Sequence, residues 1–471
     1  MKRKMIAYKN RRPFSPGRLS LRFCLLLCLI SVAWIEAGAQ NPVLQEYIKL
    51  GLQSNQGLKQ VKLDYAANLS ALKEARGMFF PDLSLNARYT IADGGRTIEF
   101  PVGDLLNPVY STLNVLTGTE AFPQIENQEF TFMRPREHET KMTLVQPIFN
   151  TDLIYNHGIK KQYTEIARID VDRYKRELIR EITVAYYDYQ KAVNLVWLAD
   201  TSISLVNENL RVSTRLYEND KVTIDAVYRS ESELSKVEVQ LAQARNMLEA
   251  SSAYFNFLLN RSLDAPIEIF TDVPVPVLVS LEDASTRAIQ NRVELDQIRQ
   301  YQVLNKHVTS LHRGNNVPGL FGVVDYGFQG EEYNFTRDDD FMMASLVMRW
   351  SLFKGTTNHF KVQQSQIEGE KLNELLTQTQ QLIKLEVINH FYAVKAAYES
   401  VQSAQKQTRS AIRAYELISR KYGEGQSSLL ELIDARTSLT SAAANSIIAE
   451  VAYFSQLADF NFAMGDAQIE E

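Results

Sequence analysis

The sequence predicts a mostly α-helical chain with a small β part, built from two copies of one unit. Three observations predict this fold class. Similar segments recur at an offset of about 205 residues, long proline-free stretches carry apolar residues spaced alternately three and four apart, and four short stretches alternate apolar with polar residues. The chain has 471 residues, of which 45% are hydrophobic, so it can bury a large core. We expect long coiled-coil helices and two strands in each copy, hence four strands per chain.

The first 39 residues have the pattern of a secretory signal peptide. Basic residues precede an apolar run at 23–35, and the tripeptide Ala-Gly-Ala at 37–39 offers a cleavage site. The run is shorter than the roughly 20 residues that a membrane-spanning helix needs. Both cysteines, Cys24 and Cys28, lie in this segment, so we expect a mature chain without disulfides or cysteine chemistry. The residue before Cys28 is leucine, not a small residue, which argues against a lipid anchor.

Charge and motif content argue against an enzyme. The formal net charge is −5, and removal of the signal, with its eight Lys/Arg and one acidic residue, leaves −12. A chain this acidic is not expected to bind nucleic acid. The six histidines form no HExxH motif, and the sequence has no GxGxxG, GxxxxGK or GxSxG. We therefore expect no catalytic site, no cofactor and no metal site.

The two copies are expected at 40–270 and 271–471. Residues 180–196 (REITVAYYDYQKAVNLV) and residues 385–401 (LEVINHFYAVKAAYESV) are 205 positions apart and share four residues. These are Glu181/Glu386, Tyr187/Tyr392, Ala192/Ala397 and Val196/Val401. Such self-similarity indicates a duplicated unit.

Long helices follow from the apolar spacing. Between residues 178 and 217 the apolar positions alternate steps of four and three, the seam of a coiled coil, and ten of the twelve positions 205 residues later are also apolar. No proline interrupts either stretch, so helices of some 65 residues, roughly 100 Å, are possible. We expect a helix ahead of the first strand, and further helices over about 151–218, 223–262, 280–312, 356–421 and 427–464.

Four strands are expected ahead of the long helices, over about 81–91, 138–149, 318–329 and 341–353. In the first, Leu83, Leu85 and Ala87 alternate with Ser84 and Asn86. A sheet half covered by helices shows this pattern, and so does an outer-membrane barrel strand. Four strands cannot close a barrel, two chains would leave little lumen, and three would supply twelve strands. The segments 92–137 and 330–340 would then cap the hairpins.

Two helix-to-helix turns are expected where the long helices end. After Tyr422, Gly423 and Gly425 can supply the left-handed or tight backbone that the turn needs, and Ser427 or Ser428 can cap the returning helix. In the first copy, Asn219 and Asp220 stand in place of the glycines after Tyr217, and Thr223 can cap the returning helix.

Four segments together resemble the TolC-like outer-membrane efflux protein family. They are FPDL at 80–83, QPIF at 146–149, WSLFKG at 350–355 and YGEGQSSLLELIDA at 422–435. The resemblance covers essentially the whole mature chain. It implies a two-repeat channel-tunnel, in which a homotrimer forms a shared 12-stranded β-barrel in outer-membrane lipid. It also implies a helical tunnel in the periplasm that docks on a periplasmic adaptor protein and an inner-membrane pump.

The resemblance also implies a periplasmic aperture. Glu431 and Asp434, three apart on one helix face, match the acidic positions that narrow the periplasmic mouth. The corresponding first-copy positions are Ala226 and Arg229, and we hypothesise that Arg229 pairs across the chain interface with Glu431 or Asp434. The expected function is a passive, gated exit duct of a tripartite efflux or type I secretion system. The alternative is a periplasmic coiled-coil adaptor without a channel of its own.

Overall fold

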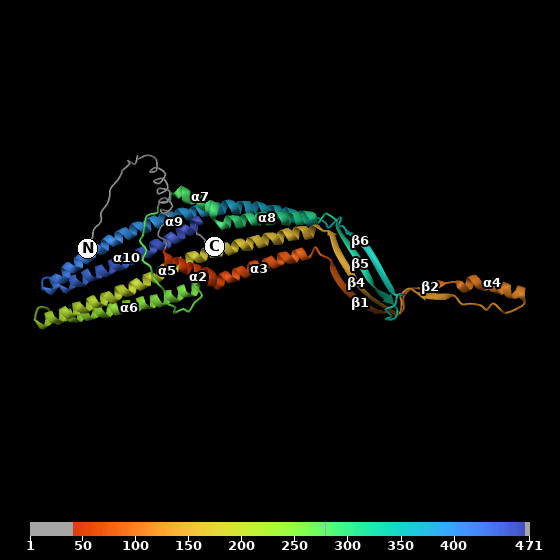
Figure 1. The fold of residues 1–471 in the computed structure, drawn as a ribbon, viewed down its shortest axis with the longest axis horizontal. Helices are drawn as coiled ribbons and strands as arrows, with labels where there is room; N and C mark the ends of the chain where they lie inside the picture. The colour runs from red at the N-terminus through yellow and green to blue at the C-terminus, as the bar shows by residue number, and fades with distance from the viewer. Residues whose placement is uncertain (1–40, 278, 467–471) are drawn as a thin grey trace, which may run out of the picture. The chain divides into compact units, whose positions relative to one another are not determined.

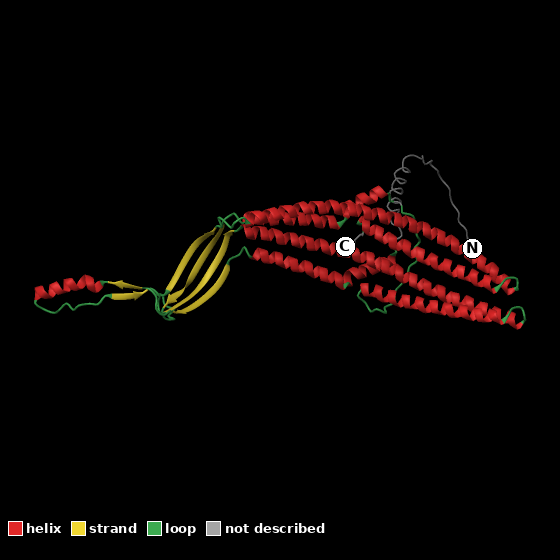
Figure 2. Ribbon diagram, turned by 180° about the vertical axis from the view of Figure 1, so that it is seen from behind, coloured by secondary structure: helices red, strands yellow, loops and turns green. Residues whose placement is uncertain are grey.

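A computed structural model describes residues 41–277 and 279–466 of the protein. The expected signal peptide, with Cys24 and Cys28, lies outside these residues. Within them the chain is mostly helical with a small β part, so the predicted fold class is confirmed (Figures 1 and 2). No helix in the described part combines the length and hydropathy required to cross a bilayer. The chain divides into two compact units, which are described separately.

Among the described residues, the first unit, called the hairpin unit, contains residues 41–56, 175–277, 279–281 and 388–466. It is helical, and two of its helix pairs are joined by short turns. Its helices are α2 (Pro42–Ser54), the second part of α5 (Thr151–Glu218), α6 (Ile224–Leu258), the second part of α9 (Thr357–Gly423) and α10 (Leu429–Met464). The helices α5 and α9 contain 68 and 67 residues. They reach this length because no proline removes a backbone hydrogen bond within them.

The coiled-coil seam of the sequence forms the core of the hairpin unit. Leu178, Ile182 and Ala192 of α5 and Val394 and Val401 of α9 are all buried. Buried aromatic rings also pack against one another in this unit. The rings of Tyr47 and Phe255 pack edge to face with their centroids 5.1 Å apart, and the centroid of the Tyr186 ring lies 5.9 Å from that of Phe255. Offset and edge-to-face pairs of this kind stabilise a core beyond the area that they bury.

Two tyrosines of α5 form hydrogen bonds with the segment that follows α6. The Tyr187 hydroxyl donates to Asp272 at 2.6 Å, and the Tyr186 hydroxyl accepts from the Phe270 backbone N–H at 2.8 Å. Burial raises the pKa of the Tyr187 hydroxyl, and its bond to the Asp272 carboxylate raises it further. The hydroxyl therefore stays protonated, as a donor to a carboxylate must be.

The second unit, called the sheet unit, contains Gly57–Tyr174 and Glu282–Val387. Its main sheet is antiparallel, in the order β1-β4-β5-β6, so β1 and β6 are its edges. Each of the four strands is joined at one end to a helix of the same unit. The strands are β1 (Asp82–Ile91), β4 (Arg136–Phe149), β5 (Gly319–Gly330) and β6 (Asp340–Arg349), and the helices are α3 (Gln56–Gly77), α7 (Leu281–Asn291), α8 (Val293–Gly314) and the first parts of α5 and α9.

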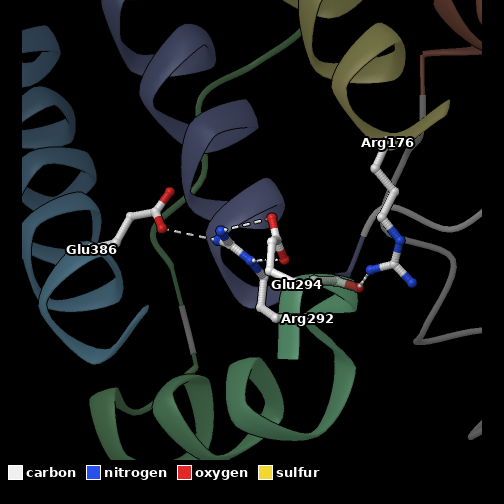
Figure 3. Close-up of polar contacts among 5 residues, drawn as sticks. Arg176, Arg292, Glu294 and Glu386 are labelled. Atoms are coloured by element: carbon white, nitrogen blue, oxygen red, sulfur yellow. Dashed lines mark hydrogen bonds and ion pairs between the residues drawn. The ribbon is translucent and has the colours of Figure 1, made fainter. Parts of the chain in front are cut away.

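The single helix expected over 280–312 is wrong, because the chain breaks at Arg292 between α7 and α8. Arg292 has extended backbone (φ −72°, ψ 117°) and an almost fully buried side chain. Its guanidinium lies 2.9 Å from the Glu294 carboxylate and 3.0 Å from Glu386 of α9, as Figure 3 shows. Paired charges make burial of the arginine possible. The ion pairs therefore stabilise the break between α7 and α8. The spacing of apolar residues in the sequence does not reveal it.

One further expectation about the sheet unit needs correction. The last strand ends at Arg349, not at residue 353, because its partner β5 begins at Gly319, opposite Arg349, and offers no residues to pair with beyond that point. The segment 92–137, expected to cap a hairpin, contains three further elements: β2 (Thr97–Phe100), α4 (Val102–Thr117) and β3 (Gln128–Thr131). The strands β2 and β3 form a separate two-stranded sheet.

Candidate functional site

The first helix turn of the hairpin unit lies between α5 and α6. Asp220 adopts φ +55°, so it occupies the left-handed position that glycine usually takes. The Asp220 N–H donates to the Tyr217 carbonyl at 2.9 Å, and the Lys221 N–H donates to the Leu216 carbonyl at 2.9 Å. Thr223 occupies the N-cap of α6, but its hydroxyl bonds to the Asp225 carboxylate and not to a backbone N–H as expected.

The second turn, between α9 and α10, repeats the first. Gly425 adopts φ +72°, its N–H donates to the Tyr422 carbonyl at 2.9 Å, and the next N–H donates to the Lys421 carbonyl at 2.8 Å. Gly423 is the last helical residue of α9, so of the two glycines only Gly425 is left-handed. One residue with positive φ is enough to end the helix, because the two backbone bonds then satisfy its last carbonyls.

Glu431 has a local role at the start of α10. The Ser428 hydroxyl accepts from the Glu431 backbone N–H at 3.2 Å, and the Glu431 carboxylate accepts from the Ser428 backbone N–H at 3.2 Å, which is a capping box. The Ser427 hydroxyl donates to the same carboxylate. These bonds, that of Ser427 first, hold the pKa of Glu431 below its usual range, so the side chain is charged at neutral pH.

The other two residues expected at the aperture are solvent-exposed. Asp434 is three residues beyond Glu431 on α10, so the two carboxylates share one face of the helix. The guanidinium of Arg229 lies 3.4 Å from the Asp225 carboxylate, one turn earlier on α6. Within one chain, therefore, Arg229 has a partner on its own helix.

The two hairpins are joined near their turns by a buried hydroxyl cluster. The Tyr422 and Ser213 hydroxyls lie 2.8 Å apart, and the Ser213 and Ser230 hydroxyls 3.1 Å apart. Tyr422 thus connects α9 to both helices of the first hairpin. Its ring forms a buried cluster with Tyr415 and Leu432, and the apolar residues packed against this cluster are Leu205, Val212, Leu216, Ile418, Leu429, Ala435 and Leu439. Burial raises the pKa of the Tyr422 hydroxyl, which keeps it neutral.

We expect Tyr422→Phe to loosen the contact between the hairpins. The substitution preserves the ring but leaves Ser213 with one buried hydroxyl partner fewer, at a cost of about 1 kcal/mol. Thermal unfolding followed by circular dichroism should show a lower midpoint. Tyr217→Phe is the matched control, because that tyrosine is exposed. Equal midpoints for the two variants would contradict the role of the hydroxyl cluster.

A buried ion pair makes a second connection between the hairpins. Arg436 of α10 and Glu233 of α6 are 6% and 13% exposed, and their charged groups lie 2.6 Å apart. Sequence reasoning missed this pair. A signal was present, because Arg436 lies in the apolar series Leu429, Leu432, Leu439, at the spacing of a coiled-coil seam. A charge at such a position requires a partner on a neighbouring helix.

One face of the main sheet is apolar, and the other carries the polar groups of the sheet beside apolar residues such as Val323 and Met343. Leu85, Met142, Tyr326 and Met342 are aligned across the four strands on the apolar face. On the other face the Thr143 hydroxyl donates to Asp325 at 2.6 Å, and Glu139 pairs with Lys141 at 2.8 Å and with Arg88 at 3.3 Å. The expected alternation therefore separates the two faces as predicted.

An aromatic cluster covers one end of the apolar face. The His138 ring is fully buried and stacks on the Tyr333 ring, with 4.4 Å between the ring centroids. Tyr333 in turn stacks on Tyr89, with 5.7 Å between the centroids. Tyr333 and Phe335 belong to the segment that joins β5 and β6. They lie at the ends of the strands that are not joined to helices. Sequence reasoning did not place these rings together, because the loop residues carry no periodic pattern.

Comparison with known proteins adds a family match. Residues 284–466 match the model of a family described as outer membrane efflux protein. The chain is 20% identical over 459 residues to outer membrane protein TolC of Salmonella enteritidis, covering 93% of this chain and 85% of that protein. It is 21% identical over 436 residues to outer membrane protein TolC of Escherichia coli (strain K12), covering 88% and 81%.

Solved structures share the fold. The Campylobacter jejuni CmeC outer membrane channel has a TM-score of 0.74 at 14% identity, covering 91% of this chain and 87% of that one. The outer-membrane channel OprN has a TM-score of 0.73 at 14% identity, covering 90% of each chain. The open state of the Neisseria gonorrhoeae MtrE outer membrane channel has a TM-score of 0.69 at 16% identity, covering 90% and 89%.

Proposed function

We propose that the chain is a member of the TolC-like outer-membrane efflux protein family, which the family match over residues 284–466 and the similarity to two TolC proteins support. The protein is an outer-membrane channel, the passive exit duct of a tripartite efflux or type I secretion system. Three copies form the duct, with the four-stranded sheets in the outer membrane and the long helices in the periplasm. Energy for transport comes from an inner-membrane pump, to which a periplasmic adaptor protein connects the duct.

The observation that carries this proposal is a two-faced sheet that cannot close on itself. Its edges, β1 and β6, would leave unpaired backbone groups in lipid, each costing several kcal/mol. If β1 of one copy pairs with β6 of the next, three copies give twelve strands and no edge. Eight strands from two copies would leave an interior filled by side chains. The apolar face then meets lipid, and the polar face lines the lumen.

The aromatic cluster fits this orientation. Outer-membrane barrels carry rings at both lipid–water boundaries. Tyr89, Tyr333 and the buried His138 lie on the lipid side of the proposed barrel, at the end distant from the helices. They would mark the outer boundary of the membrane.

Purification tests the proposal as a whole. We expect the protein to fractionate with the outer membrane and to have the mass of three chains after detergent extraction. The coiled-coil adaptor considered as the alternative would be water-soluble or associated with the inner membrane. A water-soluble monomer without affinity for detergent would overturn the duct proposal.

Cysteine scanning of β1 tests which face of the strand is exposed to water. Single cysteines at Ser84, Asn86, Arg88 and Thr90 should react with a water-soluble maleimide, whereas cysteines at Leu83, Leu85, Ala87 and Tyr89 should not. The reason is the period of two in a strand, which sends alternate side chains to the lumen and to lipid. Labelling is measured in intact outer membranes by a gel shift. The same labelling at odd and even positions would contradict the orientation.

At the periplasmic end, we propose that Glu431 and Asp434 form the aperture. In three copies they would place six carboxylates around one axis, which attracts cations and opposes closure unless basic groups pair with them. Arg229 would supply that pairing from a neighbouring copy. The capping-box bonds of Glu431 support a fixed position for its charge, and the exposure of Asp434 leaves it accessible to another chain.

The latch is tested by conductance in planar bilayers. We expect the double variant Arg229→Ala, Asp434→Ala to open more often and to conduct more than the unmodified protein, because the pair can no longer hold neighbouring tips together. Arg245→Ala is the control, since Arg245 is an equally exposed arginine of α6 that lies 3.8 Å from Asp200. Unchanged conductance in the double variant would refute the latch.

A further inference from the structure

The segment between β1 and β4 is built around one helix, α4, that has two different sides. Residues 92–135 leave the sheet where β1 ends and return where β4 begins. This end of the strands is opposite the end joined to helices. In Figure 1, β2 and α4 lie beyond this end of the strands. Within the segment, β2 and β3 pair in antiparallel register, with Ile98 opposite Phe130.

One side of α4 is hydrogen-bonded to the segment between α4 and β3. The Asn107 side chain donates to the Ile125 carbonyl at 2.9 Å and accepts from the Ile125 N–H at 2.9 Å. Asn114 makes the same two bonds with Phe122, at 2.8 and 3.0 Å. A Cβ on Gly103 would lie 2.4 Å from the Ile125 carbonyl oxygen, so only glycine fits there. These residues hold α4 as a defined surface.

The opposite side of α4 is an apolar stripe with no partner in the described part of the chain. Leu105, Val109 and Leu116 are 66%, 51% and 76% exposed, and the exposed Thr112 completes a series with steps of four, three and four. This spacing is that of a coiled-coil seam. At 100° per residue, the stripe lies about half a turn from Gly103, Asn107 and Asn114.

Charge decides between lipid and protein as the occupant of this stripe. Helices that lie on membrane surfaces carry Lys and Arg on their polar side. The helix α4 has neither, and Asp104 is its only charged residue. Residues 92–135 hold six Asp/Glu against two Arg, so an anionic outer leaflet would repel the segment. A seam without basic residues suits another helix of the same kind.

We propose that the α4 stripes of three copies pack against one another and form a helical cap over the outer mouth of the duct. The inference rests on the proposed trimer, which holds the three inserts at the same end of one barrel and at high effective concentration. Each insert also follows β1, the edge strand that borders the next copy. The interface between copies thus continues from the barrel into the inserts. The cap narrows the outer opening of the duct.

Cross-linking in the detergent-extracted protein tests the cap. The experiment uses Leu116→Cys on the stripe and, as a matched control, Ser111→Cys, which is exposed on the flank of α4. With a short bis-maleimide, Leu116→Cys should lose most of its monomer band to covalently linked dimers within the trimer. Ser111→Cys should keep its monomer band.

Two further readouts separate the possible failures. The mass of the extracted protein is measured first, and a monomer would overturn the duct and the cap together. A trimer in which Leu116→Cys links no better than Ser111→Cys would overturn the cap alone. To test lipid as the occupant, a bimane label on Leu116→Cys is exposed to spin-labelled lipid in vesicles of phosphatidylethanolamine and phosphatidylglycerol. We expect no quenching, and strong quenching would overturn the cap.

Discussion

Leu85→Arg should prevent the protein from forming a stable trimer in the outer membrane. Leu85 lies near the middle of β1 on the apolar face, beside Met142. An arginine on the lipid face of a barrel costs about 2 to 4 kcal/mol at the bilayer midplane. Three copies each carry the substitution, so the trimer would lose about 6 to 12 kcal/mol, as much as the whole stability of many proteins.

The matched control for Leu85→Arg is Ser84→Arg, one residue away on the polar face. Ser84 pairs with Thr143, which donates to Asp325, so an added guanidinium finds water and a carboxylate nearby. We expect its trimer to form normally. The amount of heat-modifiable trimer in outer-membrane fractions, resolved on gels with and without boiling, gives the comparison. If both variants assembled equally well, the apolar face would not be the lipid face.

Arg436→Ala should destabilise the contact between the two hairpins more than Tyr422→Phe does. The substitution leaves the largely buried Glu233 carboxylate without its cross-hairpin partner. Removal of one member of a buried pair typically costs about 3 to 5 kcal/mol. The remaining ion pair of Glu233 with the exposed Lys236 reduces this cost. We expect a lower midpoint of thermal unfolding and, if the tips separate, a higher conductance in planar bilayers.

Lys236→Ala provides the control for Arg436→Ala. Lys236 pairs with the same carboxylate at 2.6 Å but is 65% exposed, so its loss should cost no more than about 1 kcal/mol. A double variant, Arg436→Met with Glu233→Leu, should recover much of the stability, because it removes both charges together. Equal effects of Arg436→Ala and Lys236→Ala would show that the cross-hairpin pair has no special role.

Part of the turn and sheet geometry is predictable because it depends on near neighbours along the chain. The left-handed positions Asp220 and Gly425 follow from residue type, and the two faces of β1 follow from a period of two. The end of β6 does not follow in this way. It is set by the length of β5, its partner, which the pattern of β6 does not contain.

The helix α4 shows why a periodic pattern can be misread. Its covered side consists of Gly103, Asn107 and Asn114, which bond to backbone, while its apolar stripe is exposed. A search for buried apolar periodicity expects the reverse arrangement. Pro108 within the helix further weakens the helical pattern. The sequence therefore predicted a hairpin cap in this segment but did not predict the helix.

The sequence by itself determined the repeat, the long helices, the four amphipathic strands and the positions of the turns, because each depends on residues close together in the chain. Only the tertiary structure decided which groups meet across it. Tyr422 reaches Ser213, and Arg436 reaches Glu233, over more than 200 residues of chain. Periodicity states which residues share a face of a helix. It does not state which helix covers that face, since this depends on how the whole chain packs.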